Sequence, residues 1–110
     1  MRIPLRDLAS VIRSKNSGPY ELTLDVLFKD DQTYRRVADA GVLTGKFVAG
    51  LYGVPEESIV SVIEFPAARA IKVTMVRPIP SGALGERDVY GSQQHAPLLN
   101  AVLDLEDPTL

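Results

Sequence analysis

Apolar and polar residues alternate along positions 22–28, and this is the clearest pattern in the chain. Leucine, valine or phenylalanine occupies every second position, and Thr23 and Asp25 lie between them. Because successive side chains of a strand point to opposite faces of a sheet, one face of this segment is fully apolar. The pattern predicts a strand that covers the core with one face and presents polar groups on the other.

Three later segments also have strand patterns. Residues 59–65 are β-branched and apolar, and residues 70–77 alternate, with Lys72 on the face away from the core. The linker 66–69 is short enough to join these two segments as a hairpin. Alternating apolar residues over 99–105 predict a last strand.

Helical spacing and cap residues predict the helices. Leucine, alanine and isoleucine at helical spacing over 5–12 predict a short helix or turn. The turn 29–31 offers an N-cap for a helix that ends at Gly41. A second helix is predicted from Thr44 to Gly53, with a proline just beyond it.

This order of elements predicts an α+β fold, a ferredoxin-like sandwich in which helices cover one face of a four-stranded sheet. Residues 1–110 form one domain in this interpretation. A β-α-β crossover followed by a hairpin places strands 22–28 and 70–77 side by side at the centre. Asp25 and Lys72 then face each other on the uncovered side, as an ordinary cross-strand ion pair or as part of a docking surface. We favour the docking surface.

Composition narrows the possible functions. The chain has 110 residues, 45% of them hydrophobic and 24% charged, with a net charge of −2, which is typical of a globular protein. That charge argues against nucleic acid as a general partner. No apolar run is long enough to span a membrane, and the first residues do not resemble a signal peptide, so we expect a cytoplasmic protein. With no cysteine and one histidine, we expect neither a metal site nor a cofactor.

The most informative polar segment is Arg-Ser-Lys-Asn-Ser-Gly-Pro at 13–19, predicted to be a loop. An arginine binds a carboxylate or phosphate through two N–H groups, a lysine adds a point charge and an amide orients an oxygen. An ordinary polar turn, with asparagine and glycine in left-handed geometry, is the alternative. The candidate ligand-binding residues here are Arg13, Ser14, Lys15, Asn16 and Gly18, to which Lys72 and Arg77 are added from strand 70–77.

A second polar segment, 88–98, contains the single histidine. His95 is a candidate general acid or base because its ordinary pKa of about 6.5 suits proton transfer near neutral pH. Asp88 is its candidate catalytic partner, and Gln93 and Gln94 are candidate donors to an oxyanion. The alternative is a surface loop with a structural histidine, within a longer loop predicted from residue 78.

The motifs at 13–25, 71–72, 77–78 and 88–98 resemble a small bacterial family, domain of unknown function 4387. The first motif is also similar to the Arg-Ser-Gly-Asp-Lys-Gly motif in the small ferredoxin-fold domain of acyclic terpene utilisation (AtuA-like) proteins. Here Ser-Lys-Asn-Ser-Gly at 14–18 replaces Ser-Gly-Asp-Lys-Gly, so the acid is absent and the lysine is displaced. The resemblance implies a small subunit that works beside a larger AtuA-like protein in catabolism.

These observations lead to one expected function and two alternatives. We expect an accessory subunit that docks through its uncovered sheet face and helps to bind a carboxylate or acyl-CoA intermediate. The first alternative is a stand-alone lyase, hydratase or isomerase, as a homo-oligomer, in which His95 acts with Asp88 or Asp25. The second is a non-catalytic regulatory module that binds an anionic metabolite.

Overall fold

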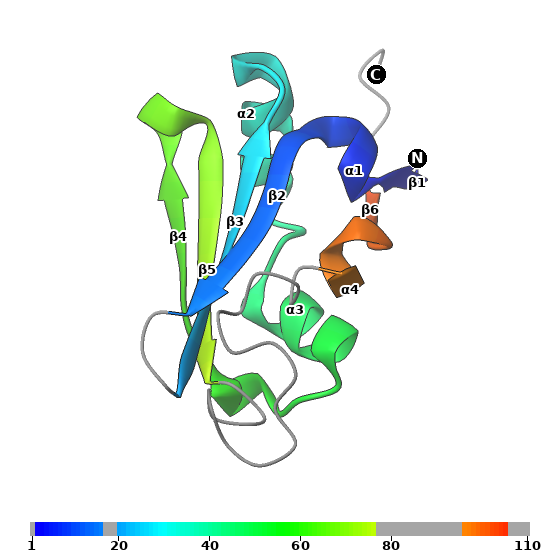
Figure 1. Ribbon diagram of the computed structural model, residues 1–110. Helices are drawn as coiled ribbons and strands as arrows, with labels where there is room; N and C mark the ends of the chain where they lie inside the picture. Colours follow the sequence, from blue (N-terminus) through cyan, green and yellow to red (C-terminus); the bar gives the residue numbers. More distant parts are fainter. Residues whose placement is uncertain (1, 17–19, 77–95, 106–110) are drawn as a thin grey trace.

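A four-stranded antiparallel sheet, with strand order β2-β3-β5-β4, organises the fold (Figure 1). The computed structural model describes residues 2–16, 20–76 and 96–105. The strands are β2 (Ala9–Asn16), β3 (Glu21–Phe28), β4 (Ile59–Phe65) and β5 (Ala70–Val76). The central positions of β3 and β5 are as predicted, and so is the hairpin from β4 to β5, through the short 3-10 turn η2 (Pro66–Ala68).

Helix α2 (Asp31–Ala40) follows β3 and has the predicted caps. The Asp30 carboxylate accepts a hydrogen bond from the Thr33 backbone N–H at 2.7 Å, which satisfies a donor of the first turn. Gly41 ends the helix with φ at +63°, in the left-handed region that glycine adopts without steric cost.

Helix α3 (Gly45–Tyr52) is capped in the same way. The Thr44 hydroxyl oxygen accepts from the Phe47 N–H at 3.1 Å, and Gly53 follows the helix with a positive φ. Both helix predictions are therefore confirmed. A short 3-10 turn, η1 (Glu56–Ser58), leads from this helix to β4.

Apolar side chains fill the space between the sheet and the helices. On the covered face, Leu24 of β3 lies opposite Val73 of β5, and both are almost fully buried. The fully buried side chains include Leu5, Leu22, Leu24, Val26, Val37, Val48, Val73, Met75, Leu98, Leu103 and Leu105. The predicted mixed α+β fold, with helices on one face of an antiparallel sheet, is confirmed.

The N-terminal prediction was only partly correct. The helix predicted over 5–12 is the single turn α1 (Leu5–Leu8), and the next residues form β2 rather than a helix and a loop. Edge pairing with β3 provides backbone hydrogen bonds along this whole segment. The strand was hard to recognise because Ser14 and Asn16 occupy positions on its covered face, where alternation normally places apolar residues.

The last strand also differs from the prediction. β6 (Val102–Asp104), preceded by the short helix α4 (Ala96–Leu99), pairs with β1 (Arg2–Pro4) and not with the main sheet (Figure 1). The edge of β3 is already occupied by β2, so the last strand has no place beside it. Within the described ranges, no helix is long and apolar enough to span a membrane.

The cap of α2 generates a prediction about acid stability. Hydrogen bonds from the backbone and side chain of Thr33 lower the pKa of Asp30 below its usual 3.8. A carboxyl whose pKa is lower in the folded state contributes stability above its unfolded pKa and loses it as pH falls through the folded pKa. Asn caps helices as well as Asp. We therefore expect Asp30→Asn to match wild type at pH 7 and to lose less stability between about pH 4 and about pH 2.

Urea unfolding at pH 7, 4 and 2.5 measures this effect. Gln32→Ala, which changes an exposed residue of the first turn but neither the cap nor a titratable group, is the control and should follow the wild-type pH dependence. An Asp30→Asn variant that loses as much stability in acid as wild type would contradict the role assigned to this carboxylate.

Candidate functional site

Strand β2 distributes the predicted anion-binding residues over two faces of the sheet. Arg13 and Lys15 lie on the face without helices, which we call the open face, and Ser14 and Asn16 lie on the covered face. Ser14 is buried and Asn16 is half-buried, and both have polar interactions there. The interpretation of 13–16 as a loop was wrong, because these residues belong to strand β2. Successive side chains of a strand point to opposite faces, so these four side chains cannot all contact one ligand.

The open face gathers three cations around one carboxylate. Arg13 Nε lies 3.2 Å from Asp25 Oδ2, and Lys15 lies two positions further along the same strand. Lys72 stands directly opposite Asp25 on the neighbouring strand, as predicted from the sequence. These residues line a cavity of about 210 Å³ together with Leu27, Phe65, Ala68 and Ala70.

Asp25 is buried although it lies on the open face. Its side chain is 8% exposed, whereas that of Arg13 is 62% exposed. A buried carboxylate requires a charged or hydrogen-bonding partner, and the Arg13 guanidinium provides one. Asp25 therefore fixes the position of Arg13, while the exposed part of the guanidinium remains accessible to a ligand.

Lys72 is placed by an aromatic ring. Its Nζ lies 5.6 Å from the centroid of the Phe65 ring, within the range of a cation–π interaction. Asp25 and Lys72 are cross-strand neighbours, as predicted, but the ion pair observed at Asp25 is with Arg13. Lys72 adds positive charge to the cavity without being needed to neutralise Asp25.

The lining of this cavity combines charged groups, most of them positive, with apolar side chains. Three cations, Arg13, Lys15 and Lys72, outnumber the single carboxylate of Asp25 among the lining residues. Phe65, Leu27 and the two alanines provide apolar surface beside the charges. Among the residues that the structure describes, no group of three or more histidine, cysteine or acidic side chains is placed to hold a metal ion.

The other predicted site residues lie outside the described residues. They are Gly18, Arg77, Asp88, Gln93, Gln94 and His95, and their roles stay predictions. Sequence reasoning also missed Phe65 and Ala68 as lining residues, because they come from the end of β4 and the following turn. Strand alternation over 59–65 was the available signal for Phe65.

The Arg13–Asp25 pair can be tested by a double-mutant cycle with Arg13→Met and Asp25→Asn. Because Arg13 is largely exposed, solvent screens the pair, and we expect a coupling energy between about 0.5 and about 1 kcal/mol from urea unfolding. Lys15→Met, on the same face of the same strand, should show no coupling with Asp25→Asn. Additivity within roughly 0.3 kcal/mol for the Arg13 cycle would contradict the pairing.

Comparison with known proteins identifies the family. No curated protein and no solved structure matches the chain. The family model described as "Domain of unknown function (DUF4387)" matches residues 5–102. The match includes both polar segments and every strand of the main sheet. The resemblance inferred from the motifs at 13–25 and 88–98 is thereby confirmed, and the chain belongs to the DUF4387 family.

Proposed function

We propose that this protein is an accessory subunit that binds the anionic group of a small metabolite on its open sheet face, next to a larger partner protein. The observation that carries this proposal is the excess of cations at the cavity, where Arg13, Lys15 and Lys72 surround one buried carboxylate. Net positive charge at this position, on a chain with a net charge of −2, favours an anion.

The dimensions of the cavity limit the ligand. A volume of about 210 Å³ suits a carboxylate head group with a short acyl chain, and it is too small for a whole nucleotide. Arg13 is held by Asp25 and can pair with a carboxylate without losing much side-chain freedom. The apolar floor beside the cations suits the acyl part. For an acyl-CoA, we therefore place the free carboxylate of a dicarboxylic acyl group in the cavity and the nucleotide outside it.

The rest of the open face supports docking of a partner. Large apolar side chains are exposed around the cavity, among them Val11, Ile63, Phe65 and Val76, each more than 40% exposed. By strand register they share the face of Asp25 and Lys72. Two copies of this face would bring their cations together, so we favour an acidic and apolar surface of a different protein. The family resemblance suggests an AtuA-like protein for this role.

We also propose that the fold is a variant of the ferredoxin-like sandwich. The crossover from β3 through α2 and α3 to β4, with β5 inserted between the two strands, fits that arrangement. In this variant β2 occupies the edge position that the last strand was predicted to take. The alternative of a stand-alone enzyme depends on His95 with Asp88 or Asp25. His95 and Asp88 lie outside the described residues, Asp25 is paired with Arg13, and no described observation favours this alternative.

Ligand binding can be measured through stability. Succinate and glutaryl-CoA, which both carry a free carboxylate, are suitable probes, and a ligand present at 100 times its Kd would stabilise the protein by roughly 2.7 kcal/mol. We expect Lys72→Gln and Lys15→Gln each to raise Kd by about tenfold, the size of one charge-assisted hydrogen bond. Lys46→Gln, on the exposed side of α3, is the control and should leave Kd unchanged. Equal effects of all three variants would contradict an anion site on the open face.

Partner binding needs a separate experiment, with the tagged protein purified from its host and the complex weighed by native mass spectrometry. We expect a stoichiometric larger protein that is lost with Lys15→Glu and Lys72→Glu and retained with Lys46→Glu, because charge reversal opposes an acidic partner surface. A homo-oligomer without a partner, or a complex that is insensitive to both open-face variants, would overturn the proposal.

A further inference from the structure

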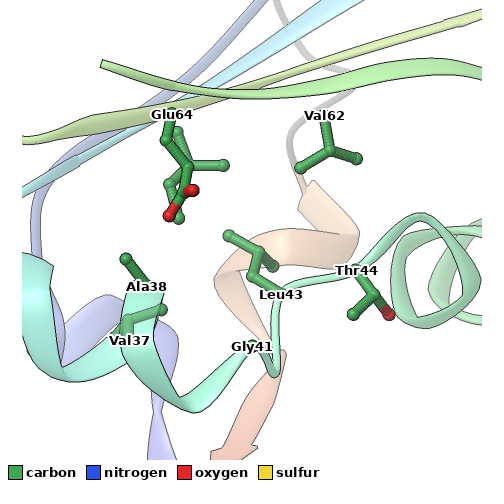
Figure 2. A pocket seen from close by; sticks show the side chains of 8 residues that line it. Val37, Ala38, Gly41, Leu43, Thr44, Val62 and Glu64 are labelled. Carbon is green, nitrogen blue, oxygen red and sulfur yellow. The ribbon is translucent and has the colours of Figure 1, made fainter. Parts of the chain in front are cut away.

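A second cavity lies on the covered side of the sheet, between the C-terminal half of α2, the turn after it, and strands β4 and β5 (Figure 2). Its volume is about 260 Å³. The side chains of Val37, Leu43 and Ile71 form a buried apolar wall, and half-buried Ala38 and Val62 extend it. The cavity is thus separate from the anion site, which lies on the opposite face.

Glu64 places a carboxylate at this cavity. It stands opposite Ile71 in the sheet and on the same face as Val62, so strand alternation directs it toward the helices. Figure 2 shows its carboxylate pointing toward the end of α2 that carries Val37 and Ala38. The side chain is exposed overall, so the charge lies at the mouth of the cavity, which Thr44 and the backbone of Gly41 also line.

The end of α2 makes this cavity more negative. The helix has ten residues, and no basic residue in its last turn offsets the partial negative charge of its terminal carbonyls. Asp39 of that turn lines a different cavity, together with Arg36, so in the described part of the chain Glu64 is the one charged residue that lines this one. The neighbouring Tyr34 responds to these charges: burial raises the pKa of its phenol first, and Glu64 and Asp39 raise it further. Within the described residues, no cation is paired with Glu64.

We propose that this cavity binds a small organic cation, an alkylammonium with a short branched hydrocarbon body. The ammonium pairs with Glu64 beside the C-terminal end of α2, and the hydrocarbon packs on Val37, Leu43 and Ile71. At about 30 Å³ per water-sized group, the volume of about 260 Å³ holds roughly eight such groups. A primary amine with four or five carbons therefore fits with space to spare.

A different explanation of Glu64 must be distinguished from binding. β4 is the edge strand of the sheet, and an inward-pointing charge on an edge strand hinders edge-to-edge pairing with another chain. In that case Glu64 prevents association and binds nothing. The two explanations differ in whether a ligand contacts the apolar wall. A ligand site requires a molecule bound in the cavity, whereas protection of the edge does not.

The test is an NMR titration of the full chain with 3-methylbutylamine, using backbone amide and methyl signals. 3-Methylbutan-1-ol has the same hydrocarbon body without the charge, and 3-methylbutanoate reverses it. We expect the amine to shift signals of Val37, Leu43 and Ile71 with a millimolar Kd, and the other two compounds to bind at least tenfold more weakly. Glu64→Gln, which keeps the size of the side chain, should raise the Kd of the amine at least tenfold, and Glu57→Gln, in η1, should not.

Three results would overturn the proposal. The first is equal binding of the amine and the alcohol, which would show that charge plays no role. The second is an unchanged Kd in a folded Glu64→Gln variant. The third is the absence of amine binding, and dimerisation of Glu64→Val would in that case assign Glu64 to protection of the edge. Each result leaves the anion site untouched, because that site is tested with anions and lysine variants.

Discussion

The antiparallel pairing of β2 with β3 determines both the fold and the site. It places a basic strand at the edge of the sheet, and the last strand pairs with β1 instead. It also brings Arg13 of β2 beside Asp25 of β3, with Nε and Oδ2 at 3.2 Å. Without this pairing, the cations of residues 13 and 15 would not share a surface with Lys72.

The two faces of the sheet then acquire opposite electrostatic character. On the open face, one buried carboxylate is surrounded by three cations and by exposed apolar residues. On the covered face, Glu64 and the end of α2 make a small apolar cavity negative. The two ligand sites that we propose therefore differ in the sign of charge that they bind, and the sheet lies between them.

Much of the fold was predictable because its signals are local. Alternation over 22–28, the caps at Asp30, Gly41, Thr44 and Gly53, and the short hairpin linker each depend on a few neighbouring residues. β2 was missed because its covered face includes Ser14 and Asn16, and its stability comes from pairing with a distant segment. The same difference between local and distant signals applies to the site. The cross-strand register of Asp25 and Lys72 was predicted correctly, whereas the distribution of residues 13–16 over the two faces of the sheet could not be predicted without β2.

The most direct test of a functional open face is amine labelling of the four lysines, read by mass spectrometry in the complex purified from the host and in the free chain. Lys15 and Lys72 lie on strands of the open face, whereas Lys29 lies in the turn after β3 and Lys46 lies in α3, so each molecule contains its own controls. We predict protection of Lys15 and Lys72 in the complex, with Lys29 and Lys46 labelled as in the free chain. Unchanged labelling of Lys15 and Lys72 in a complex that protects Lys29 or Lys46 would contradict the account.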